Sequence, residues 1–408
     1  MSLIKPFRAL RPAPGRAADV LAPPYDVLSS AEAFDRAKGK PWSFLHVSKA
    51  EIDLDPAIDP YDRGVYSKAA ENLRRMIAAG VLVRDDKPCY YAYRLTWRDR
   101  VETGFAAVAS IAAYAENRIR KHEMTTPAKE DDRVRQIEAV NAQTGPVMLA
   151  YPDARGIDAE LTRAAEAKPA VDVTADDGVR HQLWVIADEA SIVALTSAVD
   201  ALPALYIADG HHRSAAALRV AEARGEKDGY FLAVLLPQRE MTILDYNRVL
   251  RDLNGLTPEE VLREIGRRYS VKPVDEPVRP TCADEVGMIL GRRWHHLALK
   301  PEIVAEAAQS SDPVARLPVT LLAKNILEPV FAISDQRRDK RIDFVGGGRG
   351  LGELERLVSS GAFAAGFALH PTGMRDLMAV ADAGGIMPPK STWFEPKLAD
   401  GMVSHMLE

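Results

Sequence analysis

The sequence predicts an α/β protein with a mixed sheet, followed by a smaller C-terminal α+β domain. Between Leu183 and Leu236, short apolar strands alternate with helical segments, as expected when helices cover a sheet with some parallel strands. The segment Thr257-Pro258-Glu259-Glu260 is a strong helix start that opens the last part of the chain. We therefore expect one domain over residues 1–250 and a second over 251–408, whose tail folds back.

The first elements follow from local signals. Residues 1–28 are rich in Pro and Arg and are predicted to be extended. Ser29 and Glu32 form a capping-box pair, so a helix is expected to start there. Helical spacing of apolar residues predicts a helix over Tyr61–Ala79, ended by Gly80. The strands Cys89–Trp97 and Gly104–Ala112, with a polar turn between them, predict a hairpin.

The alternating middle consists of five expected elements. These are the strand Leu183–Ala187, the helix Ser191–Leu202, the strand Leu205–Ala208, the helix Ser214–Arg224 and the strand Tyr230–Leu236. Gly225 follows the second helix in the position typical of a C-cap.

The last third has weaker signals. Three prolines between Ser270 and Pro280 indicate a loop. An amphipathic helix is expected over Val319–Leu327, and a strand, loop and helix over Ile342–Ser359.

Composition narrows the class of protein. The 408 residues are 47% hydrophobic and 27% charged with a net charge of −5, which is typical of a globular chain and gives no basic excess for nucleic acid. The two cysteines, Cys89 and Cys282, are too few for a disulfide framework and fit a reducing compartment. No apolar run reaches the ~18 residues that a membrane span needs, and the charged N-terminal segment predicts no signal peptide. We expect a cytoplasmic protein.

The clearest chemical motif is Ile207-Ala208-Asp209-Gly210-His211-His212-Arg213, which follows a strand and opens a helix. Ligands of open α/β sheets bind at such strand ends, and a helix start favours an anion. Gly210 permits the turn, Arg213 could hold a phosphate, Asp209 could be a base or metal ligand, and the two histidines could donate to a phosphoryl group. The alternative is that Asp209 only caps the helix.

A second group of candidate residues is His122 and Glu123, followed by Lys129 and Arg133. A carboxylate beside cations can act as a general base or hold Mg²⁺ at a phosphate. The alternative is an exposed charged turn before a helix. Near the C-terminus, Lys390, Ser391 and Lys397 lie among prolines and aromatic residues, either as phosphate contacts or as part of a structural strap.

Taken together, these motifs resemble the bacterial and archaeal family called domain of unknown function 1015. The matching segments are PPYDV at 23–27, HEMT at 122–125 with Lys129 and Asp132-Arg133, IADGHHR at 207–213, Asn247–Val249 and MPPKSTWFEPK at 387–397. Trp393 and Glu395 stand where the family's tail is expected to carry tyrosine.

The DGHHR turn also resembles the phosphate-binding turn of the ParB/sulfiredoxin superfamily, which includes free serine kinases. The resemblance implies a ParB/sulfiredoxin-like first domain in which residues 209–213 contact nucleotide phosphates. His211 stands where sulfiredoxins carry a reactive cysteine, which argues against cysteine redox chemistry.

These observations predict a small-molecule phosphotransferase that moves a phosphoryl group between a nucleotide and serine or phosphoserine, assisted by Mg²⁺. Glu123 is the expected base, with Asp209 and Glu123 as magnesium ligands. The expected ligand contacts are Tyr25, Asp26, His122, Lys129, Arg133, Gly210, Arg213, Lys390, Ser391 and Lys397. Two alternatives are a phosphatase of a small phosphomonoester and a nucleotide-binding switch without turnover. We expect no nucleic acid or membrane partner, and a homodimer is an open option.

Overall fold

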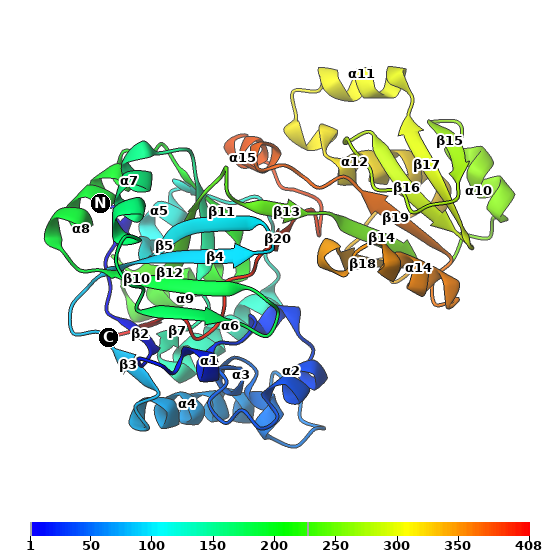
Figure 1. Ribbon diagram of the computed structural model, residues 1–408. Helices are drawn as coiled ribbons and strands as arrows, with labels where there is room; N and C mark the ends of the chain where they lie inside the picture. Colours follow the sequence, from blue (N-terminus) through cyan, green and yellow to red (C-terminus); the bar gives the residue numbers. More distant parts are fainter. Residues whose placement is uncertain (1, 227) are drawn as a thin grey trace. The chain divides into compact units, whose positions relative to one another are not determined.

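A nine-stranded mixed sheet is the centre of the first of two units in the computed structural model, which describes residues 2–226 and 228–408 (Figure 1). The first unit is Met1–Met241 with Pro396–Glu408, and the second is Thr242–Glu395. The sequence places the boundary after residue 250 instead. The strand β14 (Tyr246–Leu250) lies in the second unit because it pairs there with β18 and β19.

The strand order of the large sheet is β6-β11-β8-β12-β5-β4-β10-β9, with β1 beside β5. The strands are β1 (Ile4–Lys5), β4 (Tyr90–Trp97), β5 (Arg100–Ser110), β6 (Ile119–Arg120), β8 (Val147–Tyr151), β9 (Val171–Thr174), β10 (Arg180–Ile186), β11 (Leu205–Asp209) and β12 (Tyr230–Pro237). The pairs β12–β8 and β11–β6 are parallel, whereas β11–β8 and the β4–β5 hairpin are antiparallel. The predicted mixed sheet is confirmed.

A smaller sheet ties the C-terminus to the N-terminal segment. Its order is β3-β2-β21-β7, formed by Leu82–Arg84, Ala9–Pro12, Ser404–Met406 and Ala142–Gln143. The C-terminal end of the chain, drawn in red in Figure 1, therefore lies in the first unit. The prediction of a tail that folds back is confirmed.

The helices predicted to start at Ser29 and to span 61–79, 191–202 and 214–224 form in the first unit with shifts of up to three residues at their ends. The helices of this unit are α1 (Ala17–Val20), α2 (Ser30–Ala37), α3 (Leu45–Ser48), α4 (Arg63–Ala78), α5 (Ile111–Ala115), α6 (Pro127–Val140), α7 (Arg155–Ala164), α8 (Glu189–Asp200) and α9 (His211–Arg224). Ser29 and Glu32 form the predicted capping box of α2. Helix α9 lies between two layers, because Ala217 and Ala221 join the core on the large sheet while Ala216 and Val220 pack with α6.

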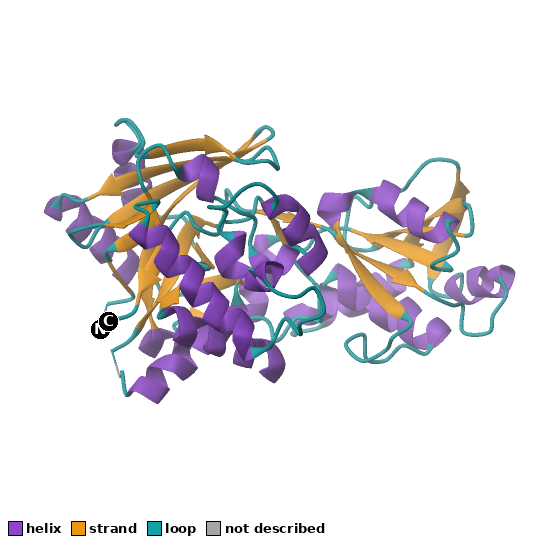
Figure 2. Ribbon diagram, turned by 90° about the horizontal axis from the view of Figure 1, so that it is seen from below, coloured by secondary structure: helices purple, strands orange, loops and turns teal. Residues whose placement is uncertain are grey.

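The second unit has a six-stranded antiparallel sheet of order β15-β17-β16-β19-β14-β18, and Figure 2 shows helices beside its strands. The remaining strands are β13 (Thr242–Leu244), β15 (Tyr269–Val274), β16 (Glu285–Leu290), β17 (Arg293–Leu299), β18 (Ile342–Gly346), β19 (Ala365–Leu369) and β20 (Trp393–Glu395). The helices are α10 (Pro258–Ile265), α11 (Pro301–Gln309), α12 (Pro318–Leu322), α13 (Glu328–Phe331), α14 (Leu351–Ser359) and α15 (Met374–Asp382).

Two local predictions differ from the structure in this unit. The segment predicted as a loop after Ser270 contains β15, which pairs with β17 and lies at the edge of the sheet. Proline is tolerated in an edge strand, so Pro273 does not prevent pairing. The helix predicted over Val319–Leu327 is interrupted, since α12 passes into a π-helical turn over Ala323–Leu327.

Across residues 2–226 and 228–408, each helix is too short or too polar to cross a lipid bilayer.

Candidate functional site

The motif that follows β11 forms a tight turn into α9. Gly210 has a φ of 102°, which only glycine adopts readily. A Cβ atom at this position would lie 3.1 Å from Nε of Arg213 and 3.3 Å from Cα of Val147. The pairing of β11 with β8 shifts register between Ile207 and Asp209, and such irregularities re-aim side chains at strand ends. In the described chain no side chain caps α9, so the reading of Asp209 as a helix cap is wrong.

Arg213 is held by protein groups. Its side chain is 10% exposed, and Nη1 donates a hydrogen bond to the carbonyl oxygen of Pro146. Nη2 lies 3.3 Å from Oδ2 of Asp209 and 3.8 Å from Oδ2 of Asp26. The guanidinium therefore joins the start of α9 to the 23–27 segment. Its predicted contact with a phosphate stays a prediction.

Asp209 has two cationic neighbours. In addition to Arg213, Nζ of Lys397 lies 3.4 Å from its Oδ2 atom. Burial alone would raise the pKa of Asp209, but Lys397 and Arg213 outweigh it and hold that pKa well below its usual range. Asp209 is thus ionised at neutral pH and is a poor proton acceptor.

The two histidines accept hydrogen bonds from the main chain. Nε2 of His211 accepts the N–H of His122 at 3.4 Å, and Nε2 of His212 accepts the N–H of Thr126 at 3.2 Å. This geometry assigns a lone pair to each Nε2 and places the proton of each neutral ring on Nδ1. Burial first, and then His122, lowers the pKa of His211 well below its usual value. One nitrogen of each ring therefore holds the 122–126 loop, and the predicted donation of these histidines to a phosphoryl group stays a prediction.

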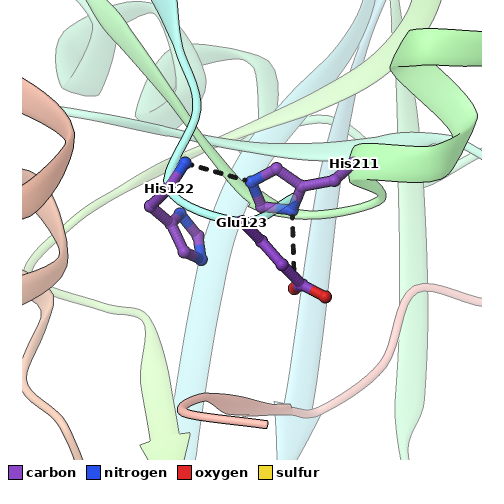
Figure 3. A group of neighbouring side chains, drawn as sticks. All are labelled: His122, Glu123 and His211. Carbon is purple, nitrogen blue, oxygen red and sulfur yellow. Dashed lines mark hydrogen bonds and ion pairs between the residues drawn. The ribbon is translucent and has the colours of Figure 1, made fainter. Parts of the chain in front are cut away.

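His122, Glu123 and His211 form a compact group (Figure 3). The two histidine rings are edge to face with centroids 4.4 Å apart, and burial lowers the pKa of His122 to about 4. The side chain of Glu123 is 43% exposed, and its Oε2 atom lies 3.9 Å from Nδ1 of His211. One possible ligand atom from each residue lies within 4.8 Å of the others. The magnesium ligands predicted from the sequence are Asp209 and Glu123. Of these, only Glu123 belongs to the group of possible ligands found among the described residues, because Asp209 pairs with Lys397 and Arg213.

Next to the turn is a cavity of about 250 Å³. The sequence-predicted residues in its wall are Tyr25, Asp26, Lys129, Arg133 and His212, and the wall also includes Lys49, Glu51, Tyr61, Tyr66 and Asp132. Arg133 donates to Asp132, and its guanidinium carbon lies 3.8 Å from the centre of the Tyr25 ring. Burial raises the pKa of Tyr25 to about 12, so its hydroxyl keeps its proton.

Asp400 is a buried acid that the sequence motifs do not identify. It is 2% exposed, and its Oδ2 atom accepts the main-chain N–H of Tyr25 at 3.2 Å. Burial raises the pKa of Asp400 to about 7, although Arg213 opposes the shift. The one sequence signal is an acid inside the apolar stretch 398–403, which only the fold brings next to Tyr25.

Lys390 and Ser391 belong to the second unit. Nζ of Lys390 lies 5.4 Å from the centre of the Tyr246 ring, and the hydroxyl of Ser391 donates to the carbonyl oxygen of Pro388 at 2.7 Å. Their predicted contact with a ligand at Asp209 stays a prediction.

The chain belongs to the family described as "Protein of unknown function (DUF1015)", which matches residues 4–320. Among proteins of curated function, none matches it.

Solved structures with a similar arrangement include a conserved hypothetical protein from Pyrococcus furiosus (12% identity, 72% of this chain and 93% of that chain, TM-score 0.35). A free serine kinase in complex with AMP is 11% identical (71% and 86%, TM-score 0.35). SbnI from Staphylococcus aureus, truncated at its C-terminus, is 12% identical (73% and 86%, TM-score 0.37).

Proposed function

We propose that the protein is a small-molecule phosphotransferase that moves a phosphoryl group between a nucleotide and serine or phosphoserine. The observation that carries the proposal is the start of α9, where the described chain supplies no side-chain cap and where the Asp209–Lys397 ion pair lies alongside. His212 of the same turn lines the charged cavity. Main-chain N–H groups at a helix start, together with a lysine, bind and neutralise phosphate oxygens.

The acceptor would occupy the 250 Å³ cavity. That volume lies below the roughly 300–1,000 Å³ of sites for drug-sized ligands, so it suits a molecule as small as serine better than a whole nucleotide. Its wall carries Lys49, Lys129 and Arg133 as cations, and Asp26, Glu51 and Asp132 as acids. A wall with both signs of charge suits an amino acid, which has both an ammonium and a carboxylate group. The choice of serine as the substrate rests on the resemblance of the DGHHR turn to the corresponding turn of free serine kinases.

Two carboxylates would have separate roles. Asp209 would keep Lys397 and Arg213 in place, because its low pKa makes it a weak base. Glu123 is the better candidate to take the proton of the attacking hydroxyl, because Asp209 is already paired with Lys397 and Arg213. Mg²⁺ would bind chiefly through the nucleotide phosphates, as it does when a protein supplies only one or two carboxylates.

Incubation of the full chain with serine, MgCl₂ and ATP or ADP tests the proposal. Mass spectrometry and phosphorus NMR should detect phosphoserine and the shortened nucleotide. The variant Lys397→Met should lower kcat/KM at least about tenfold, which corresponds to ~1.4 kcal/mol of lost transition-state stabilisation. Lys300→Met is the matched control, because Lys300 donates to the carbonyl oxygen of Arg267 in the second unit.

Either of two results would show that the protein has another function. Release of phosphate from phosphoserine without any nucleotide would identify a phosphatase. A nucleotide-dependent rise in Tm without product would identify a binding switch.

A further inference from the structure

We propose that His122, Glu123 and His211 form a binding site for one divalent transition-metal ion of the Zn²⁺ class. The three side chains come from the loop before α6 and from the first residue of α9, and one ligand atom of each lies within 4.8 Å of the others (Figure 3). The proposal rests on this geometry and does not depend on phosphoryl transfer.

His122 is prepared as a metal ligand. Its side chain is 2% exposed, and the ring hydrogen-bonds to the main chain of Ile207. Among the described residues, no group hydrogen-bonds to Nδ1 of His122, so the bond to Ile207 comes from Nε2. Histidines that bind metals commonly donate their second nitrogen to a backbone carbonyl, which fixes the ring and leaves the other lone pair for the ion. A buried nitrogen without a partner is costly, and a metal ion would remove that cost.

His211 must change tautomer when the ion binds. In the structure its Nε2 atom accepts the N–H of His122, so its proton is on Nδ1, the nitrogen that faces Glu123. An ion bound at Nδ1 displaces this proton, and the neutral ring then carries its proton on Nε2. The contact with the N–H of His122 is then lost, because Nε2–H and that N–H are both donors, and the two groups must turn apart. The ion has to offset this cost as well as remove that of the unpartnered Nδ1 of His122.

Glu123 completes the donor set and leaves it accessible. Its side chain is 43% exposed, so water or a ligand can reach an ion that the carboxylate binds. Two imidazoles and one carboxylate favour zinc, iron or manganese, whereas Mg²⁺ prefers oxygen ligands throughout. A Glu123 carboxylate that binds an ion is not available as a general base, so the zinc-bound form is distinct from the form that the phosphotransferase proposal needs.

Calorimetric titration of the full chain with ZnCl₂, after chelator treatment and dialysis, tests the site. We expect one ion per chain and no competition from millimolar MgCl₂. Glu123→Gln, an exposed position that should fold normally, is expected to weaken zinc binding at least about tenfold. His296→Ala is the matched control, because Nε2 of His296 lies 3.2 Å from Glu285 in a similar pair elsewhere. Absence of one-to-one binding, or equal affinity in the parent and Glu123→Gln, would overturn the proposal.

Long-range proton–nitrogen NMR spectra provide a second readout that needs neither activity nor a variant. The proton of His211 should be on Nδ1 in the metal-free protein and on Nε2 with zinc. Zinc binding that leaves the proton on Nδ1 would place the ion elsewhere and refute this site. Neither experiment contains a nucleotide or serine, so a negative result here leaves the phosphotransferase proposal to its own test.

Discussion

Lys397 places its ammonium group 3.4 Å from a carboxylate oxygen of Asp209, a residue 188 positions earlier in the chain. The contact is possible because the last residues return to the first unit, where β21 pairs with β2 and β7. Asp209 is 30% exposed and Lys397 is 16% exposed, so water screens the pair only in part. The C-terminal segment therefore supplies a charge to the turn that opens α9.

Replacing Lys397 with methionine should destabilise the protein by about 1–3 kcal/mol, because it removes one partner of a charged hydrogen bond while Arg213 remains. Urea unfolding at pH 7 measures the loss. The pKa of Asp209 is depressed in the folded state, so this stabilisation is present above the usual pKa of an aspartate and is lost as the pH falls. The gap between parent and variant should therefore narrow in acid once the pH falls below the pKa that Asp209 has in the folded variant, and a gap that is wider at pH 3 than at pH 7 would contradict the assignment.

Much of the fold could be predicted from the sequence because its signals come from residues that are close together in the chain. The capping pair of Ser29 with Glu32 and the helix start at Thr257 form in the structure as expected, because each depends on residues within three positions of one another. The strand β15 was not predicted, since Pro273 and the two prolines that follow the strand indicate a loop, and its pairing with β17 depends on residues 20 or more positions along the chain.

The candidate site also has one part that could be predicted from the sequence and one part that could not. The turn at Gly210 follows from a glycine between a strand and a helix. The main-chain bonds to His211 and His212 could not be predicted, because they join that turn to a loop 86 to 89 positions away. Asp400 carries no motif, and only tertiary structure buries it behind Tyr25.

Substitution of Gly210 by alanine should cost more stability than the same change at Gly225. Both glycines have positive φ, which costs alanine about 1–2 kcal/mol. Only at Gly210 would the added Cβ also meet Arg213 and the backbone of Val147, whereas at Gly225 no atom of the described residues lies within 4 Å of it. Thermal unfolding of the two variants isolates the contribution of the crowded turn. Equal losses would show that Arg213 moves aside without cost.

Asp400→Asn should gain stability relative to the parent as the pH rises from about 4 to about 7. The folded pKa of Asp400, about 7, lies above the ~3.9 of an unfolded aspartate, so the folded state keeps the proton over this interval while the unfolded chain loses it. The parent therefore loses stability through this group with rising pH, and asparagine does not. We expect a relative change of about 2 kcal/mol, since one pKa unit corresponds to ~1.4 kcal/mol and neighbouring groups relax.

Unfolding curves of both proteins at half-unit pH steps check this. Asp55→Asn is the control, because Asp55 is exposed and accepts only a local N–H from Ala57. Parallel stability profiles for the parent and Asp400→Asn would show that Asp400 does not titrate in this range.

The packing of Trp393 against Gly346 gives the last prediction. The ring of Trp393 packs edge to face on Tyr246, with centroids 5.3 Å apart, and a Cβ at Gly346 would lie 2.7 Å from a ring carbon. The φ of Gly346 is −64°, which alanine adopts easily, so the contact with the indole, and not backbone strain, opposes the substitution. Gly346→Ala should cost about 1–3 kcal/mol of stability through overpacking. Gly352→Ala is the control: among the described residues its Cβ would meet nothing within 4 Å, and it lies in α14, where alanine is favoured by about 0.5–1 kcal/mol.

The double variant Gly346→Ala/Trp393→Ala should be more stable than the sum of the two single losses implies, because removal of the ring also removes the clash. Strictly additive losses in urea unfolding would mean that the added methyl group is accommodated without the indole.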